Sequence, residues 1–351
     1  MGERRVRTIE ASSVAVVRTD RLGDLLLSTP LFQAIKEASP DCRVIAVAAA
    51  YALPALEGNP HVDEILPWEA DGGTARALAA RRPDAAIVLN PSFGSCRAVR
   101  SAGIRFRTGP LSQPSSFLYL NRGIRQGRSR AGKHQSELDA AFAPLVTGGR
   151  ARGTPAPFLR VNGAERDAGA EILRRAGAWE ERPLAGLHAG SGDSALVWPE
   201  ASYAELGRLL LGSGWKLVLT GTGGEKPLAE RLAASIGPGT FIVAGDHPLR
   251  DFFGIISHLN LFVAPSTGPL HAAAALGVPV ASPFPPLPSQ SPARWGPRGA
   301  VTAVLAPPVA CPARIRCIGR RCRHHPCMEL VRPEDLSRAI LALPRGRREE
   351  T

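Results

Sequence analysis

The feature that most constrains the fold of this chain is an alternation of short apolar runs with segments of helical periodicity. The runs 14–17 and 84–90 are almost wholly apolar, as strands are when they are buried on both faces of a parallel sheet. Between the first run and the next one, at 43–50, lies the segment 24–38, where apolar residues recur at helical spacing. Strands that alternate with helices predict a doubly wound parallel sheet, so we expect an α/β protein.

The same alternation starts again after a linker rich in Gly, Arg, Thr and Pro at 148–157. A chain of 351 residues is too long for one compact core, which favours about two domains. We therefore predict two Rossmann-like domains, 1–150 and 151–351, with parallel sheets that face a central cleft. In the first domain a helix is expected at 135–145. In the second, strands are expected at 183–188, 215–220, 241–244 and 261–264, and helices at 165–176, 203–211, 227–235 and 249–257.

Three Gly-rich turns follow predicted strands of the second domain, at 189–194, 221–225 and 266–268. Because the carboxyl ends of parallel strands share one edge of a sheet, we expect these turns to lie where open α/β sheets bind ligands. Their hydroxyl and backbone N–H groups, with Ser191 and Gly192 among them, favour a nucleotide diphosphate. None of the turns matches a P-loop or a G-x-G-x-x-G fingerprint, which argues against a P-loop NTPase or a standard dinucleotide dehydrogenase.

The third turn belongs to the stretch 263–280, in which an apolar run leads through a turn into a helix of small residues. Ser266 and Thr267 are good N-cap residues, and Gly268 lets a ligand approach the backbone closely. A helix N-terminus is an anion site, and His271, one turn into the helix, could face the same anion. The alternative is an ordinary strand–turn–helix crossover with a structural histidine.

The chain is strongly basic: 43 Lys and Arg against 31 Asp and Glu give a formal charge of +12. The basic residues are densest between 97 and 133. Such a run is commonly a solvated face, but it also fits an anionic acceptor or an anionic membrane leaflet. Nucleic acid is poorly supported, because few aromatic residues are interleaved and no binding motif is recognised. No apolar run reaches the roughly 18 residues of a membrane span, and 14–17 is too short for a signal-peptide core, so we expect a cytoplasmic protein.

Three motifs occur in the order Arg21-Leu-Gly-Asp-Leu-Leu-Leu-Ser-Thr-Pro30, His188-Ala-Gly-Ser-Gly…Trp198-Pro-Glu200 and Ser266-Thr-Gly-Pro-Leu-His-Ala-Ala-Ala-Ala-Leu-Gly277. Together they resemble glycosyltransferase family 9, the ADP-heptose:lipopolysaccharide heptosyltransferase family. The resemblance implies a GT-B fold and metal-independent, inverting transfer of a heptose or related sugar from a nucleotide diphosphate donor such as ADP-heptose. The acceptor would be the lipopolysaccharide core or a related lipid-linked glycan, reached by a protein peripheral to the inner membrane. The first domain would bind this anionic acceptor and the second the donor.

Asp24, in the first motif, matches the catalytic base of the family. Inverting transfer needs one carboxylate to take the proton of an acceptor hydroxyl as its oxygen attacks the anomeric carbon. Asp24 is expected where a loop meets a helix at the carboxyl edge of the first sheet, and the positive end of the helix dipole would keep it ionised. The alternative role for Asp24 is that of a helix cap.

The resemblance also implies residues for the two substrates. The donor site would comprise residues of the three turns, namely Ser191, Gly192, Glu225, Ser266, Thr267, Gly268 and His271. Within it, Glu225 matches a ribose-binding glutamate, although a glutamate at a helix start could instead act as a cap. The acceptor contacts would be Arg18, Arg21 and His134; for His134 an ordinary surface histidine is the alternative.

Two positions depart from the family pattern. Many members have a lysine two residues before the Trp-Pro pair, where this chain has Leu196, and many have an aspartate where it has Ser266. A metal-free transferase must offset the charge of the leaving diphosphate, so another cation would have to substitute: Lys226, Arg294 or Arg298. The competing hypothesis is a non-catalytic or divergent binding protein that keeps the fold with an eroded donor site. A basic nucleic-acid binder ranks third.

Six cysteines fall into two groups. Cys42 and Cys96 are isolated and expected to be buried as small hydrophobic residues. The others, Cys311, Cys317, Cys322 and Cys327, cluster within 17 residues, with His324 and His325 between the last two. Their spacing differs from the C-x₂-C pairs of common zinc sites, so a structural Zn²⁺ or cluster site, reduced thiols and a disulfide pair all remain open. A last helix is expected at 333–343.

Overall fold

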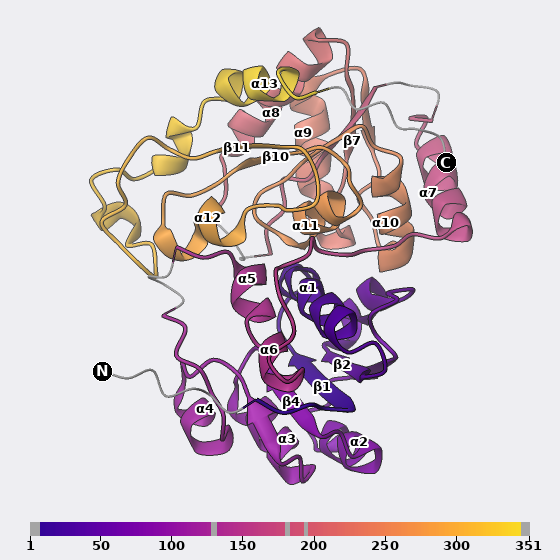
Figure 1. Ribbon diagram of the computed structural model, residues 1–351. Coiled ribbons are helices and arrows are strands. Elements are labelled where there is room, and N and C mark those ends of the chain that lie inside the picture. The colour runs from indigo at the N-terminus through magenta and orange to yellow at the C-terminus, as the bar shows by residue number, and fades with distance from the viewer. Residues whose placement is uncertain (1–7, 128–131, 180–182, 193–195, 345–351) are drawn as a thin grey trace. The chain divides into compact units, whose positions relative to one another are not determined.

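The structure is a computed structural model that describes residues 8–127, 132–179, 183–192 and 196–344 (Figure 1). The chain divides into two compact units, Met1–Arg160 and Val161–Thr351, each with its own parallel sheet. The division lies ten residues after the boundary expected at 150. Each unit is an α/β layer structure, which confirms the predicted fold class.

The first unit is built on a five-stranded parallel sheet with the order β3-β2-β1-β4-β5. Its central strand pairs with β2 through Val14 and Val44, and with β4 through Val14 and Ala85. The sequence of this strand is apolar because all but its first residue are buried between two helical layers. The strands are β1 Ser13–Arg18, β2 Arg43–Ala48, β3 Glu64–Pro67, β4 Ala85–Val88 and β5 Phe106–Thr108.

Helices cover both faces of this sheet, with α1, α5 and α6 on one side and α2, α3 and α4 on the other (Figure 1). They are α1 Leu22–Ala38, α2 Gly73–Arg81, α3 Phe93–Ser101, α4 Pro114–Tyr119, α5 Gln135–Ala140 and α6 Ala143–Val146. The helix predicted at 24–38 is confirmed. The single helix predicted at 135–145 is wrong, because the chain breaks between α5 and α6. Pro144 lies in the first turn of α6 and has no N–H with which to continue the hydrogen-bond ladder of α5.

The second unit has a six-stranded parallel sheet with the order β11-β10-β9-β6-β7-β8. The chain starts in the middle, builds outward to β8, and then returns to the other side of β6 to build outward again. The strands are β6 Leu184–Leu187, β7 Lys216–Leu219, β8 Thr240–Ile242, β9 Leu261–Val263, β10 Val280–Pro283 and β11 Thr302–Leu305. The sequence predicted the first four and missed β10 and β11, of which β10 carries Ser and Pro in its second half.

The helices of the second unit again form two layers, with α8, α9 and α13 on one face of the sheet and α7, α10 and α11 on the other (Figure 1). They are α7 Gly163–Arg175, α8 Glu200–Gly212, α9 Lys226–Ile236, α10 Leu249–Ser257, α11 Gly268–Ala275, α12 Pro292–Trp295 and α13 Pro333–Leu341. The predicted helices at 165–176, 203–211, 227–235, 249–257 and 333–343 are confirmed to within a few residues. Among the described residues no helix combines the length and the hydropathy needed to cross a membrane.

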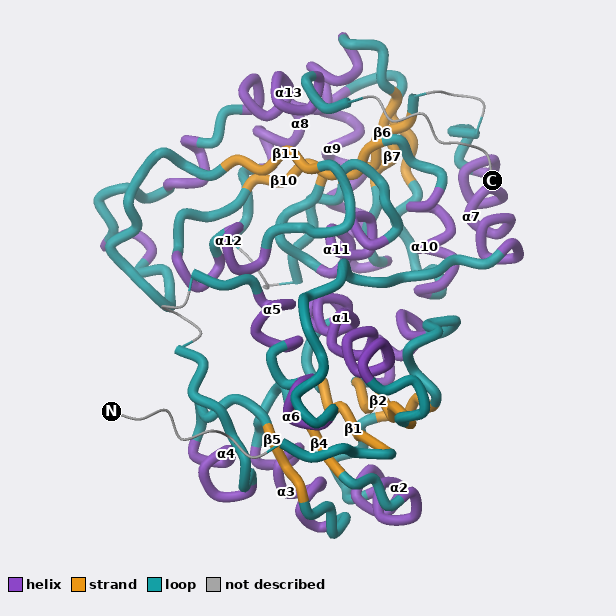
Figure 2. The backbone as a smooth tube through the Cα atoms, viewed as in Figure 1, coloured by secondary structure: helices purple, strands orange, loops and turns teal. Residues whose placement is uncertain are grey.

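The Trp-Pro pair of the second motif is part of the core of this unit. Trp198 is fully buried, packs edge-on against Tyr203 at 4.9 Å between ring centroids, and donates its indole N–H to the carbonyl of Val331 at 2.9 Å. This bond fixes the chain that leads into α13. The segment that connects β11 to α13 is mostly loop (Figure 2).

Candidate functional site

In the first unit, β1 ends in Arg18 and a short loop leads directly into α1 (Figure 1). Asp24 lies in the first turn of α1, where the positive end of the helix dipole stabilises a carboxylate. Strand β1 neighbours β4, so this turn lies where the strand order of the sheet reverses, which is the usual ligand position in an open α/β sheet. No side chain forms a capping hydrogen bond at the N-terminus of α1, so Asp24 does not cap this helix.

The guanidinium of Arg18 holds Asp24 in place. Arg18 is 2% exposed, and its Nη2 donates to Oδ1 of Asp24 at 2.6 Å. The Nε lies 2.8 Å from Oδ1 of Asp20, and Nη1 lies 3.7 Å from Oδ2 of Asp139. One buried cation therefore faces three carboxylates, of which Asp24 is 18% exposed, Asp20 27% and Asp139 not at all.

Two pKa values of this cluster are raised, each for a different reason. Burial alone would lower the pKa of Arg18, but the carboxylates of Asp139, Asp24 and Asp20 outweigh it and raise that pKa. Burial raises the pKa of Asp20 to about 6, against the opposing effect of Arg18. Arg18 is therefore a permanent cation committed to its own carboxylates. The acceptor contact expected of Arg18 stays a prediction. In the structure its guanidinium binds Asp24 and orients that carboxylate.

Asp139 is the residue of this cluster that the sequence analysis missed. It lies on α5, which packs against α1, and it accepts hydrogen bonds from Ser28 Oγ at 2.9 Å and from Gln135 Nε2 at 2.8 Å. Its only sequence signal is its place five residues after His134, in an acidic helical stretch. A pairing across more than 100 residues of chain leaves no local pattern.

The other two predicted acceptor residues have contrasting surroundings. His134 is buried at the N-cap of α5, where its Nδ1 accepts from the backbone N–H of Ser136 at 3.2 Å, so the alternative of a surface histidine is wrong. Arg21 is exposed at the N-cap position of α1, as a residue that contacts an external anion must be. The contacts of both residues with an acceptor stay predictions.

In the second unit, the three Gly-rich turns lie at one edge of the sheet. They follow β6, β7 and β9, and these strands are neighbours in the order β9-β6-β7. The register places Ala185 of β6 beside Leu217 of β7 and beside Leu261 of β9, so the three carboxyl ends are level. The predicted convergence of the turns is confirmed.

The first two turns contact each other through Glu225. A side chain at Gly190 would collide with Oε1 of Glu225, so this carboxylate lies directly against the backbone of the first turn. Its other oxygen, Oε2, accepts from the N–H of Thr222 at 2.9 Å and from the Thr222 hydroxyl at 3.1 Å. Glu225 thus caps the short 3₁₀ turn Gly223–Glu225, whereas α9, the helix that it was expected to cap as the alternative, has no side-chain cap. Glu225 also lines a pocket with Gly190 and Thr220. Its contact with a ribose stays a prediction.

His188 and the predicted Ser191 and Gly192 occupy the turn after β6. His188 is buried, with Nδ1 3.1 Å from the Thr220 hydroxyl, and burial lowers its pKa, so it is neutral at physiological pH. Ser191 is half-buried and Gly192 is exposed with a φ of +48°, a left-handed conformation that favours glycine. The rest of this turn, 193–194, lies outside the described residues.

The third turn leads into α11. Thr267 occupies the N-cap position, but its hydroxyl donates to the carbonyl of Pro265 at 3.2 Å, so the expected side-chain cap is wrong. No side chain caps the first turn of α11, where Gly268 and Pro269 stand, and its N–H groups point out of the helix end. Ser266 is half-buried beside them, and His271 is buried one turn further on. This helix mouth keeps the features of an anion site.

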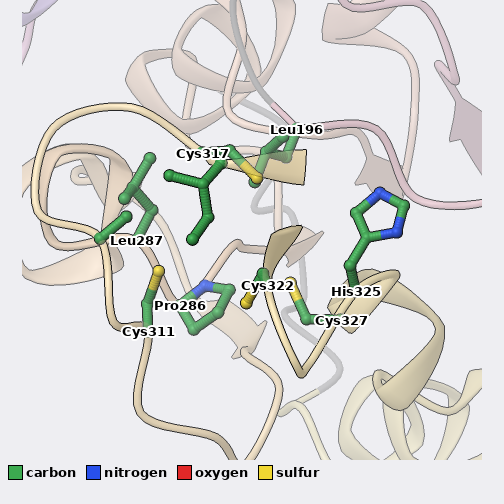
Figure 3. Close-up of a pocket in the computed structure, with 10 residues that line it drawn as sticks. Leu196, Pro286, Leu287, Cys311, Cys317, Cys322, His325 and Cys327 are labelled. Atoms are coloured by element: carbon green, nitrogen blue, oxygen red, sulfur yellow. The ribbon is translucent and has the colours of Figure 1, made fainter. Parts of the chain in front are cut away.

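Leu196, which stands where many family members have a lysine, has apolar neighbours. Leu196 lines a small pocket formed with residues of the cysteine-rich loop (Figure 3). Of the three cations suggested as substitutes, Lys226 is exposed and begins α9 directly after Glu225. Arg294 lies over the ring of Trp295, 5.0 Å from its centroid. The substitution itself stays a hypothesis.

Cys42 and Cys96 are buried, as predicted, and all six cysteines are free thiols. The other four line the pocket that contains Leu196. Burial, reinforced by the charges of the other three thiols, raises the pKa of Cys327. Among the described residues, no group of three or more His, Cys, Asp or Glu side chains has an arrangement that holds a metal ion as it stands.

Comparison with known proteins identifies the family. Residues 73–313 match the model of glycosyltransferase family 9 (heptosyltransferase), a span of more than half of the chain. A Haemophilus influenzae protein named "Putative glycosyltransferase" is 26% identical over 301 residues, covering 81% of this chain and 85% of that protein. Lipopolysaccharide heptosyltransferase 2 of Escherichia coli is 24% identical, covering 78% and 82%. The solved structure of E. coli ADP-heptose LPS heptosyltransferase II covers 94% of this chain and 98% of its own at 22% identity, with a TM-score of 0.74, and thus shares the fold. The chain therefore belongs to glycosyltransferase family 9 and is a glycosyltransferase of the heptosyltransferase type.

Proposed function

We propose that this protein transfers a heptose, or a closely related sugar, from ADP-heptose to the lipopolysaccharide core or a related lipid-linked glycan, with inversion at the anomeric carbon. The observation that supports it most directly is the clamp formed by Arg18 on Asp24. A carboxylate that is oriented by a buried cation, lies at a helix N-terminus and remains partly exposed has the properties of a general base.

In this mechanism Asp24 accepts the proton of the acceptor hydroxyl while the acceptor oxygen forms a bond to the anomeric carbon. The bond from that carbon to the diphosphate oxygen breaks, and the nucleoside diphosphate leaves with the electron pair. Arg18 keeps one oxygen of Asp24 occupied, which directs the other toward the incoming hydroxyl. Single attack on the face opposite the leaving group inverts the configuration.

The leaving diphosphate would bind at the mouth of α11, where the N–H groups and the helix dipole stabilise negative charge without a metal. The turns that carry Ser191, Gly192, Thr267 and Gly268 would surround it. Glu225 would accept a hydrogen bond from a ribose hydroxyl, and Lys226 stands next to it as a cation. ADP-heptose is favoured as donor because the E. coli protein with the same fold is named for it.

The acceptor side is proposed to contact an anionic membrane leaflet through α3 and α4. Phe93, Phe117 and Leu118 are 54–61% exposed, and Phe93 meets Tyr119 edge-on at 6.5 Å between ring centroids. Arg125 lies 5.6 Å from the centroid of the Phe117 ring. Exposed apolar side chains beside arginines suit the interface of an anionic bilayer. We therefore propose a peripheral location on the cytoplasmic face of the inner membrane.

Cosedimentation with lipid vesicles tests this membrane contact. The double substitution Phe117→Ala with Leu118→Ala is expected to weaken binding to vesicles that contain phosphatidylglycerol by about tenfold, because two apolar side chains no longer enter the interface. Leu341→Ala, which removes an exposed leucine of the second unit, is the matched control and should bind like the wild type. Absence of wild-type binding to anionic vesicles in cosedimentation would contradict the proposal.

Donor binding tests the function itself. ADP-heptose is expected to raise the melting temperature of the protein, whereas sugars carried on UDP or GDP leave it unchanged, and an acceptor lipid should then trigger release of ADP. Stabilisation by a different nucleotide sugar would correct the donor while retaining the reaction class. If no nucleotide sugar stabilised the protein, the competing hypothesis of an eroded, non-catalytic member would replace this proposal.

A further inference from the structure

The segment 311–327, called here the thiol loop, brings four cysteines to one pocket. We propose that Cys311, Cys317, Cys322 and Cys327 bind one soft divalent cation, Zn²⁺ or Fe²⁺, as a structural site. This proposal does not rest on the transfer reaction, because no step of that reaction is assigned to a residue of the thiol loop. Figure 3 shows the four cysteines arranged around the pocket together with His325.

The chemistry of the pocket selects the type of metal. Its other lining residues are Leu196, Pro286, Leu287, Ala313 and Ile318, which supply no oxygen side chain. Ca²⁺ and Mg²⁺ require oxygen ligands and are therefore excluded as occupants. Four thiolates in tetrahedral arrangement are the ligand set of structural Zn²⁺ and of mononuclear iron.

The backbone around two of the cysteines supports thiolate ligation. The N–H of Gly319 donates to Sγ of Cys317 at 3.3 Å, and the N–H of His324 donates to Sγ of Cys322 at 3.5 Å. In both cases the donor lies two residues after the cysteine, and Gly319 has the left-handed φ of +58°. Such N–H···S bonds orient sulfur ligands and stabilise their negative charge, as outer hydrogen bonds do in metal sites generally.

The same arrangement argues against two disulfides. Two disulfides would divide four cysteines into separate pairs, whereas here all four line a single pocket. As they stand, no three of them are in metal-binding geometry, and Cys317 is exposed. Metal binding would therefore rotate the cysteine side chains inward and draw the loop together, coupling ligation to local folding.

A bound metal would stabilise a specific part of the second unit. Between β11 and α13 the chain has only two short 3₁₀ turns, Gly319–Arg321 and Cys327–Leu330. The pocket also includes Pro286 and Leu287, which follow β10, and Leu196, which precedes the buried Trp198. One ion would thus strengthen a connection that Ser289 already makes, since its N–H donates to the carbonyl of Arg314 at 3.2 Å and its hydroxyl to the carbonyl of Ile315 at 2.8 Å.

Metal analysis of the full-length protein, purified under reducing conditions without a histidine tag, tests the site. We expect about one Zn or Fe per chain, with the element itself distinguishing the two. The double variant Cys317→Ser with Cys322→Ser should retain less than about a tenth of that metal. Cys42→Ala, which removes a buried thiol of the first unit, is the matched control and should keep the full content.

Two further readouts do not depend on how well the variant folds. Removal of the metal from the wild type by a chelator should expose four additional reactive thiols and lower the melting temperature by about 5 °C. Replacement by Co²⁺ should give the intense visible bands of tetrahedral thiolate coordination. Metal-free protein whose melting temperature and thiol reactivity do not respond to Zn²⁺ or Fe²⁺ would overturn the proposal, as would two disulfides found by mass spectrometry.

Discussion

Replacing Asp24 by Asn is expected to lower kcat by about 10²- to 10⁴-fold, the range that a general base contributes. The amide has the shape of the carboxylate but cannot take up the proton of the acceptor hydroxyl. Donor affinity should stay within about twofold, because the proposed donor contacts lie on other turns. The measurement is nucleoside diphosphate release under acceptor saturation, together with calorimetric titration of the donor.

Asp41→Asn is the matched control, since Asp41 is an exposed carboxylate of the same unit and should leave kcat unchanged. The melting temperature of the Asp24→Asn variant should be recorded as well, because the substitution weakens its pairing with Arg18. A folded variant that kept more than about a tenth of wild-type kcat would show that another group is the base.

Replacing Asp139 by Asn is expected to lower the free energy of unfolding by about 3 kcal/mol. Removing one partner of a buried ion pair leaves the other charge poorly compensated, which costs about 3–5 kcal/mol when no partner remains. The lower figure applies here because Arg18 keeps Asp24 and Asp20. Urea denaturation at pH 7 measures the loss. A smaller, parallel drop in kcat is expected, since Arg18 would hold Asp24 less firmly.

Asp20→Asn is the contrasting variant of the same cluster. Burial raises the pKa of Asp20 to about 6 from an ordinary value near 4, so the folded protein holds this proton more tightly than the unfolded chain. Ionisation of Asp20 therefore reduces stability as the pH rises from about 4 to about 6, and the cost is complete above that window. The Asn variant lacks this titration and should gain stability relative to the wild type across the window. Equal pH profiles for the two proteins would contradict this account.

Local pattern was sufficient for much of the fold. The apolar runs of β1 and β6 and the helical spacing of α1 depend on neighbours within one or two turns, and they predicted a doubly wound α/β chain with turns at the carboxyl ends of its strands. The placement of Asp24 in the first turn of α1 also followed from adjacent residues. Errors arose where local signals conflicted, as at Pro144, or were absent, as in β10 and β11.

The site required information that no local pattern carries. Asp139 faces Arg18 across 121 positions of sequence, and its burial is decided by the packing of α5 on α1. Likewise, the contact of Glu225 with the backbone of Gly190 depends on the pairing of β6 with β7. For His134 the sequence favoured neither a surface position nor an acceptor contact. The structure shows that His134 is buried because it caps α5.

The sequence by itself determined the class of fold, the family, the place of Asp24 in the first turn of a helix and the three turns that follow strands, because each depends on residues close together in the chain. The tertiary structure alone decided that Arg18 pairs with three carboxylates, that Glu225 lies against the backbone of Gly190, and that Leu196 and Leu287 line one pocket with four cysteines. These outcomes depend on distances between segments far apart in sequence, which are set by how strands pair and helices pack. Local periodicity indicates most of the elements, but it does not determine which elements become neighbours.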